Sequence, residues 1–460
     1  MLSIIPRDGG KIRDYLRQDT VSSRQGSNTC YSPHLGCFRM LPPLYRRLVP
    51  VVVASGLLLN GFVAWKDSDL ILKGYPDFTG LYAAGQIVRG GEGNRLYDLD
   101  LEYQLQLEFA SHVSIRHGAL PYIHPPFEAL LFAPLSLLPY FAAYLVWNGM
   151  SLAILAWAMV MLRPHLPLLQ SSHLGLWVLI SIAYFPVFIC LLQGQDMQLI
   201  LLAVAGAYLC LQAGNDFRAG CWLGLGLFRP QLILPLFFII LLGQAGGRRR
   251  WLPSTVRLSA GLGLMAALEC AASVAVSGWS GFRYYPKYVW MLERNGGYGA
   301  IEPADMPNVR GLVAALLPDS SRTALMAIAA VSIVILVLAG LAFGRARRSG
   351  SLGLGFSLAL VATVLTSYHA FMYDLALLLW ASLLVLNYVR DRAGNPDAVS
   401  LWLMLGPVGL LFSTPLLMLL WLRMGRLNIL AAILALWLYG IAKEVSGSGM
   451  AALKSEWASA

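Results

Sequence analysis

Residues 324–344, ALMAIAAVSIVILVLAGLAFG, contain no charged side chain, and RARR follows directly at 345–348. An apolar run of about 18 or more residues predicts a membrane-spanning helix. Basic residues directly after such a run are typical of its cytoplasmic end. This stretch therefore predicts a helical membrane protein, and similar runs recur along the chain.

The composition supports the same fold class. Of the 460 residues, 57% are hydrophobic and only 13% are charged, with a mean hydropathy of +0.63, whereas a soluble domain carries about 25% charged residues. We predict an all-α polytopic membrane protein with a bundle of about twelve transmembrane helices. The predicted spans are roughly 48–65, 126–139, 140–162, 174–193, 196–213, 219–242, 256–277, 324–344, 350–370, 372–388, 399–421 and 427–442.

The distribution of charge predicts the topology. A net charge of +10 could indicate a nucleic-acid partner, but the basic residues gather in short clusters beside apolar runs, as the positive-inside rule describes. We therefore expect membrane lipids and no nucleic acid as partners. A cytoplasmic N-terminus in a bacterial-type inner (plasma) membrane places the two longest connections, 66–125 and 278–323, outside the cytoplasm. We expect both connections to be structured.

The two ends of the chain differ from the membrane domain, which we expect to span 40–445. Residues 1–39 are polar and lack an apolar period, which predicts a disordered extension. Met40 opens MLPPLYRRLVPVVV, a more usual start for a membrane protein, and suggests that translation begins there. Finding Met1 by N-terminal sequencing would contradict that hypothesis. Residues 446–460 are expected to form a flexible tail.

The first long connection carries a lone acidic residue within GYPDFTGLYAAG, at 74–85. Helices are expected over 79–88 and 99–109, lying on the membrane surface. Asp77 precedes the first of them, where aspartate is a favoured N-cap. A carboxylate near the membrane boundary can equally act as a general base, because partial desolvation raises its proton affinity. Both interpretations remain open, and they are compatible.

Further polar residues interrupt apolar stretches. His124 and Glu128 flank a Pro-Pro pair, and Gln195 lies in the amide-rich turn LLQGQDMQLI. Each has an ordinary explanation, as a boundary residue or a polar turn. Arg229, followed by Pro230-Gln231, lies within a predicted span, and a buried guanidinium there should have an anionic partner. That partner is either a phosphate or a carboxylate, from among Glu128, Asp196, Asp216, Glu269 and Asp374.

The later part of the chain offers two more groups. In the second long connection, Asn308 and Arg310 form a polar pair just before an apolar stretch. In TSYHAFMYDLALLLW, His369 and Asp374 are five residues apart, so they do not share a helix face unless the helix breaks between them. Aromatic belts could explain the many rings of the second long connection, and the cations beside those rings could equally hold an anionic lipid headgroup.

Taken in order, these stretches resemble glycosyltransferase family 87, the polyprenol-phosphate-mannose-dependent mannosyltransferases of the GT-C superfamily. The resemblance covers about 75 to 385. It is carried by YPDFTGLYAAGQIVRGG at 75–91, NRLYD at 94–98, YIHPPFEALLFAPLSLLP at 122–139, QGQDMQLILL at 193–202, AGCWLGLGLFRPQLILP at 219–235, MPNVRGL at 306–312 and SYHAFMYDLALLL at 367–379. Family members often carry Lys where this chain has Arg229.

The resemblance implies a GT-C-like bundle and an integral-membrane glycosyltransferase. Such an enzyme moves a sugar, mannose in the best-known case, from a polyprenyl-phosphate donor to a lipid or glycan acceptor hydroxyl with inversion. Asp77 would be the general base. The donor is a substrate, and neither a cofactor nor a metal is expected. The candidate substrate-binding residues are Tyr82, His124, Gln195, Arg229, Gln231, Asn308, Arg310, His369 and Asp374.

Two other functions remain possible from the sequence. A lipid or solute transporter or flippase could use Glu128, Arg229, Glu269 and Asp374 as buried charges, because ionisable residues within spans mark transport pathways. We find no internal repeat of the kind common in secondary transporters. A non-catalytic relative that only binds polyprenyl lipids is the third possibility.

Overall fold

The computed structural model describes residues 43–111, 118–245, 251–294, 303–317, 321–391, 398–414 and 429–459. Every regular element in these ranges is a helix, in agreement with the predicted all-α class. The predicted disordered extension, 1–39, lies outside the described residues. Where the sequence predicted a flexible C-terminal tail, helix α21 (Ile429–Ser459) continues to Ser459.

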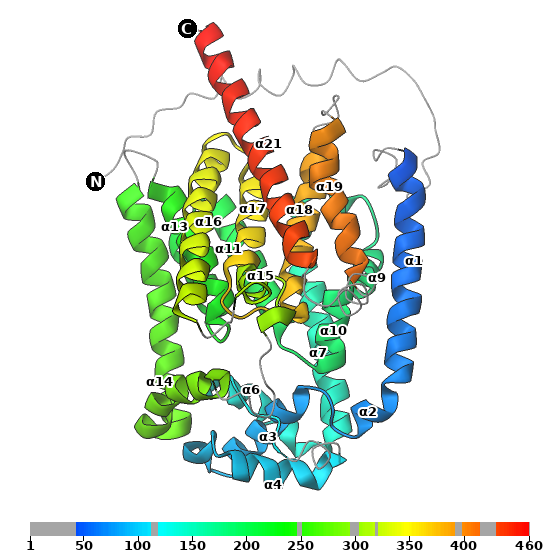
Figure 1. The fold of residues 1–460 in the computed structure, drawn as a ribbon, viewed down its shortest axis with the longest axis vertical. Coiled ribbons are helices and arrows are strands. Elements are labelled where there is room, and N and C mark those ends of the chain that lie inside the picture. Colours follow the sequence, from blue (N-terminus) through cyan, green and yellow to red (C-terminus); the bar gives the residue numbers. More distant parts are fainter. Residues whose placement is uncertain are drawn as a thin grey trace, which may run out of the picture.

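Within the described residues, six helices are long and apolar enough to cross a membrane, and a seventh span results if one bent pair is counted. These helices include α1 (Pro43–Lys66), α7 (Tyr140–Leu162), α14 (Trp251–Arg294), α16 (Arg322–Arg348) and α21, together with the segment Met372–Asp391 formed by η7 (Met372–Leu377) and α18 (Leu378–Asp391). The predicted count of about twelve spans is therefore not confirmed. Figure 1 shows α1 and α14 on opposite flanks of the bundle.

Several predicted spans are broken in the structure. The run 174–193 folds as α9 (Leu174–Ala183) and α10 (Phe185–Gln193), bent by 80°, with Pro186 in the first turn of α10. The run 219–242 divides into α12 (Asp216–Gly224) and α13 (Pro230–Ala245). In both cases a proline lies in the first turn of the second helix. Proline fits that position, but it cannot continue the helix that precedes it.

The predicted span 126–139 is wrong. It consists of three short pieces, η3 (Pro126–Glu128), α6 (Ala129–Phe132) and η4 (Leu135–Leu137), and crossing a bilayer takes about 20 helical residues. Prolines 125, 126, 134 and 139 explain the interruptions, because each lacks a backbone N–H donor and fixes its own φ angle.

Four shorter apolar helices of the described residues contribute to the main hydrophobic core: α11 (Met197–Gln212), α13, α17 (Leu352–Thr366) and α19 (Ala398–Phe412). Residues Leu358 to Ala362 are fully buried, and α17 packs against α13, α16 and α18. By contrast, α1 and α16 expose large apolar side chains, including Leu58 (76% exposed) and Met326 (73% exposed). An apolar exterior around a packed interior is what a lipid environment requires.

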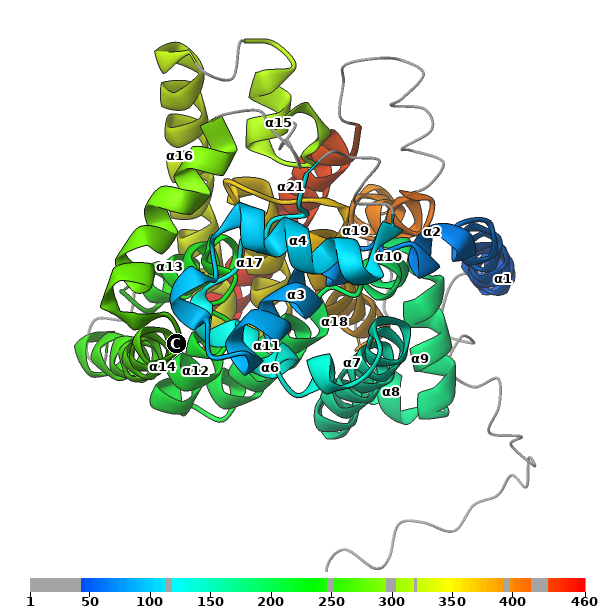
Figure 2. The same cartoon turned by 90° about the horizontal axis from the view of Figure 1, so that it is seen from below.

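A second layer, which we call the cap, covers one end of the bundle. It contains the described residues of 68–137 and includes α2 (Ser68–Leu72), α3 (Phe78–Arg89), η2 (Gly93–Arg95), α4 (Leu99–Phe109), η3, α6 and η4. The predicted helices 79–88 and 99–109 are thereby confirmed as α3 and α4. Figures 1 and 2 show α3 and α4 lying across this end. The cap has a separate core that includes Phe78, Tyr82 and Phe132 and is completed by Trp147 of α7.

The second long connection is described only in part. Helix α14 breaks at Gly278, which has a φ of +68°, a conformation that favours glycine. The segment after the break packs on the cap through Tyr285 and Tyr288. The short elements η6 (Pro303–Asp305) and α15 (Val309–Ala314) follow, and α15 packs against α16 and α17.

Candidate functional site

A cavity of about 600 Å³ lies between the cap and the end of the bundle. The start of α3, residues 120–124 and the second segment of α14 contribute one part of its wall. The turn after α10, the start of α13 and residues 368–373 contribute most of the remaining wall. Six of the residues that the sequence singled out line it: Asp77, His124, Gln195, Arg229, Gln231 and His369.

Asp77 occupies the N-cap position of α3, but its side chain makes no capping hydrogen bond. Its Oδ2 accepts a hydrogen bond from Gln195 Nε2 at 2.6 Å. Its backbone N–H donates to Gln193 Oε1 at 3.0 Å. The side chain is half-buried on the cavity wall. The structure therefore directs this carboxylate toward the turn after α10, and not toward the first turn of its own helix.

The turn after α10 is fixed by backbone geometry. Gly194 ends α10 with a φ of +63°, and an added Cβ would lie 2.7 Å from the Cβ of Phe78. Only glycine fits this left-handed position so close to α3. Trp147 Nε1 donates to the Gly194 carbonyl at 2.9 Å. The amides of Gln193 and Gln195 are thereby held against the start of α3.

Arg229 lies at the break between α12 and α13. Its carbonyl accepts the first hydrogen bonds of α13, from Leu232 and Ile233. The break explains how a residue in the middle of a predicted span reaches a cavity at the bundle end. A continuous helix over 219–242 would place it halfway along.

The Arg229 guanidinium is buried (4% exposed) and fully engaged. Its Nε donates to Asp196 Oδ1 at 2.6 Å and its Nη1 to Asp374 Oδ1 at 3.0 Å, while Nη2 donates to Gln195 Oε1. The predicted anionic partner is therefore a pair of carboxylates, Asp196 and Asp374. Gln195 joins this group to Asp77, so the base candidate and the buried cation belong to one hydrogen-bond network.

Four predicted substrate-binding residues do not line the cavity. Tyr82 is buried in the cap, where its hydroxyl donates to the Leu138 carbonyl at 2.7 Å. Asp374 lies behind Arg229, and its Oδ2 accepts from the Phe371 N–H at 2.7 Å. Asn308 caps α15 through Gly311 N, and Arg310 Nη1 donates to the Tyr368 carbonyl at 3.3 Å.

Asn308 and Arg310 act on the segment that follows α17. Asn308 Nδ2 donates to the Ser367 carbonyl at 2.8 Å, and the Arg310 guanidinium lies 4.1 Å from the centre of the Tyr368 ring. They therefore hold the segment that presents His369 to the cavity. The helix does break between His369 and Asp374, since α17 ends at Thr366 and η7 begins at Met372.

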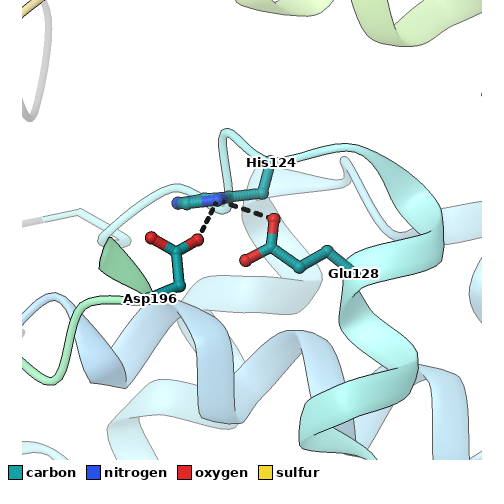
Figure 3. Close-up of side chains that lie close together, drawn as sticks. All are labelled: His124, Glu128 and Asp196. Carbon is teal, nitrogen blue, oxygen red and sulfur yellow. Dashed lines mark hydrogen bonds and ion pairs between the residues drawn. The ribbon is translucent and has the colours of Figure 1, made fainter. Parts of the chain in front are cut away.

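His124 lies two residues before η3, where four side chains hold it. Its Nδ1 lies 2.8 Å from Glu128 Oε2 and 3.4 Å from Asp196 Oδ2. Tyr122 stacks on the imidazole, and the Tyr97 hydroxyl donates to the His124 carbonyl. Figure 3 shows both carboxylates facing the same edge of the ring.

The surroundings of His124 favour its charged form. Burial disfavours the imidazolium, but the Glu128 and Asp196 carboxylates favour it more strongly, which raises the pKa of His124 to about 10. The three residues together offer one nitrogen and two oxygen ligands within 4.8 Å of one another, a spacing that could hold a metal ion.

Sequence reasoning missed several residues of the cavity wall. Tyr75, Tyr285, Tyr368 and Tyr373 line it, as does the carboxylate-bearing Asp305. Tyr368, Tyr373 and Tyr75 lie next to residues that were singled out, so adjacency could have found them. Asp305 precedes the MPNVRGL stretch, and only its packing identifies it as part of the cavity.

These features define a helical membrane protein with a large cavity at one end of its bundle, whose polar lining includes carboxylates, a guanidinium, imidazoles and amides. The chain belongs to glycosyltransferase family 87, whose family model matches residues 122–367, slightly more than half of the chain. It is accordingly a glycosyltransferase. Asp77 lies before the matched region. Searches of curated proteins and of solved structures found no match.

Family membership does not favour the transporter hypothesis. Of the four charges on which that hypothesis depended, Glu128, Arg229 and Asp374 gather around the single cluster beside the cavity. Glu269 is half-buried on α14.

Proposed function

We propose that this enzyme transfers a sugar, mannose in the first instance, from a polyprenyl-phosphate donor to a hydroxyl group of a lipid or glycan acceptor. The acceptor oxygen attacks the anomeric carbon from the face opposite the phosphate, so the configuration inverts. As the new C–O bond forms, the bond to the phosphate oxygen breaks and the phosphate leaves with the electron pair. The acceptor proton passes to Asp77.

The observation that carries this proposal is the position of Asp77 on the cavity wall. The carboxylate does not cap its helix, and Gln195 holds one oxygen at 2.6 Å. A general base must be held within hydrogen-bond reach of the proton that it removes. A fixed carboxylate beside a cavity of about 600 Å³ meets the steric part of that requirement, because the cavity has room for a sugar and part of an acceptor.

Charge on the departing phosphate requires cations or hydrogen-bond donors on the same cavity. Arg229, His124 and His369 line it, and positioned groups of this kind stabilise charge that develops in a transition state. Arg229 already binds two carboxylates, so we assign it chiefly to holding the network, with the imidazoles nearer to the phosphate. Arg310, one of the candidate substrate-binding residues, does not line the cavity and contacts Tyr368 instead.

The donor also bears on the site's location. A polyprenyl chain stays in the bilayer, and an enzyme built from membrane helices can meet its headgroup at the membrane surface. We place the cavity at the extracytoplasmic face of a bacterial-type inner membrane, because the basic loops of the sequence predict the opposite end to be cytoplasmic.

The test is a transfer assay with the purified full chain. Radiolabelled polyprenyl-phosphate mannose and glucose serve as donors, with membrane extract as the source of acceptor. Asp77→Asn removes the base and keeps a group that can accept from Gln195, so transfer should fall by about 10²- to 10⁴-fold. Asp69→Asn is the matched control, because Asp69 is an exposed acidic residue of α2 and should leave transfer unchanged.

Full activity in Asp77→Asn would show that the base lies elsewhere. If neither donor gave product with the wild-type chain although the lipid bound, the proposed donor class would be wrong. Product analysis by NMR reports the anomeric configuration, and retention would contradict the single-displacement step.

A further inference from the structure

His124, Glu128 and Asp196 form a buried group that the proposed reaction does not explain. They come from two distant parts of the chain, since His124 and Glu128 flank the start of η3 whereas Asp196 precedes α11. Glu128 is 0% and Asp196 1% exposed. Two carboxyl groups therefore face each other away from water, an arrangement in which ionising both costs free energy unless a positive charge lies between them.

The hydrogen bonds of this group are incomplete. His124 Nδ1 can donate one hydrogen, and it lies closest to Glu128 Oε2 at 2.8 Å. Glu128 Oε1 and Asp196 Oδ2 are buried and accept no hydrogen bond from any described residue. Leaving a buried carboxylate oxygen without a donor costs about 1–3 kcal/mol or more. The two oxygens therefore point to a ligand that would satisfy both.

The charge of the cluster indicates the kind of ligand. With a neutral imidazole and all three carboxyl groups ionised, Glu128, Asp196, Asp374 and the guanidinium of Arg229 sum to a charge of −2. A protonated His124 would reduce this to −1, whereas a divalent cation would balance it completely. Arg229 contacts both Asp196, at 2.6 Å, and Asp374, at 3.0 Å, and its charge is already included in this sum.

The surrounding contacts orient the donor atoms as a metal site requires. Arg229 holds Asp196 Oδ1 at 2.6 Å, which leaves Oδ2 facing the imidazole. Stacking by Tyr122 and the hydrogen bond from Tyr97 fix the ring of His124. Contacts of this kind around the ligands are a regular feature of metal centres.

We propose that His124 Nδ1, Glu128 and Asp196 bind a divalent cation of the Mn²⁺ or Zn²⁺ type. One imidazole nitrogen and two carboxylate oxygens suit these ions. Donors around one such ion lie about 2.0–2.2 Å from it and hence up to about 4.3 Å apart. The three donor atoms already lie within 4.8 Å of one another, so shifts of a few tenths of an ångström complete the site. The sequence alone predicted no metal.

Three protein ligands leave coordination positions open, and His124 is part of the cavity wall. At one of these open positions the cation would bind the donor phosphate, a role that rests on the proposed function. The binding site itself does not depend on which reaction the enzyme performs, so it can be tested without the donor.

The experiment measures metal binding by the full chain in detergent. The protein is stripped with EDTA, dialysed, titrated with MnCl₂ or ZnCl₂ and assayed by mass spectrometry of bound metal, with Mn²⁺ also followed by electron paramagnetic resonance. The wild type should bind one ion per chain. Glu128→Gln and His124→Gln should each lower the apparent affinity at least tenfold. Glu269→Gln, a half-buried carboxylate of α14, is the matched control and should bind as the wild type does.

Folding is monitored by gel filtration and by the thermal midpoint without metal. The His124 side chain is 12% exposed, so His124→Gln should disturb the fold less than Glu128→Gln. If Glu128→Gln does not fold, His124→Gln still tests the proposal. Wild-type binding no stronger than that of the His124→Gln variant would overturn the proposal and assign the positive charge to a proton on His124. Metal binding without sugar transfer would retain the site and reject the proposed donor instead.

Discussion

Asp77 and Arg229 are linked through a single side chain. Gln195 donates to Asp77 and accepts from Arg229, so a movement of the buried cation is transmitted to the base candidate. Arg229 is 4% exposed and contacts two carboxylates that are at most 1% exposed. Removing one member of such a group leaves uncompensated buried charge.

Arg229→Met tests this dependence at the residue scale. Methionine keeps much of the side-chain volume but leaves Asp196 and Asp374 without their cation, so the free energy of unfolding should fall by about 3–5 kcal/mol. It can be measured by titration with SDS in mixed micelles. Arg257→Met is the matched control. Arg257 also contacts a buried carboxylate, but its own side chain is 57% exposed, and exposed pairs contribute about 0–1 kcal/mol. Equal losses of unfolding free energy in the two variants would contradict this distinction between a buried and an exposed arginine.

At the scale of elements, side chains of α4 form hydrogen bonds with the backbone of the extended segment 118–124, as the backbone of a neighbouring strand would. Gln106 exchanges two hydrogen bonds of 2.8 Å with the backbone of Leu120, and Glu102 Oε2 accepts from the Tyr122 N–H at 3.0 Å. This segment leads directly to His124. The position of one cavity residue therefore depends on two buried polar side chains of a surface helix.

Glu102 makes the docking of α4 dependent on pH. Burial raises the pKa of Glu102 to about 8, although the hydrogen bond from Tyr122 opposes the shift. Because the folded-state pKa is above the unfolded one, the folded protein binds the extra proton. Its contribution to stability is present below about pH 4.5 and is lost as the pH rises to about 8.

Glu102→Gln should remove this part of the pH dependence, because glutamine can still accept from Tyr122 and does not ionise. We expect the fall in thermal midpoint between pH 5 and pH 8 to be smaller in the variant than in the wild type. Glu108→Gln, also on α4 but exposed, is the control. The same fall in Glu102→Gln and the wild type would place the titrating group elsewhere.

At the scale of the whole molecule, the two ends of the bundle carry different charge clusters. The cap covers one end (Figure 1), and the cavity lies between the cap and that end of the bundle. At the other, Asp216 is buried and accepts a hydrogen bond from Gln244 at 3.0 Å, with Arg257 and Arg347 within 3.6 Å. The basic residues of this second cluster agree with the charge pattern that predicts a cytoplasmic face.

Thiol labelling tests this orientation. In a background without native cysteines, Ser68→Cys at the cap should react with a membrane-impermeant maleimide in intact cells. Arg348→Cys at the opposite end should react only after the membrane is permeabilised. Both positions are exposed, so accessibility within the fold is matched. The reverse pattern would place the cavity in the cytoplasm.

Much of the molecule could be predicted from local patterns. Apolar runs identified α7 over 140–162 and α16 around 324–344, and short amphipathic patterns identified α3 and α4. The number of spans could not be predicted from hydropathy alone. Residues 219–242 form one continuous apolar run but fold as two helices. Residues 126–139 are also apolar, but prolines interrupt the helix there. The ordered motifs also identified the family that the family model confirms.

The sequence by itself determined the membrane class, the family and the residue types available for chemistry, because apolar length and motif order are local properties. Only the tertiary structure decided which of them meet. It brought Asp77, Gln195 and Arg229 into one hydrogen-bond network and placed Asp196 beside His124 and Glu128. It also placed Tyr82 and Arg310 outside the cavity wall, where they donate hydrogen bonds to backbone carbonyls. The physical reason is that a buried charge is stable only beside its partners, and chain folding alone decides which partners, distant in sequence, come within reach.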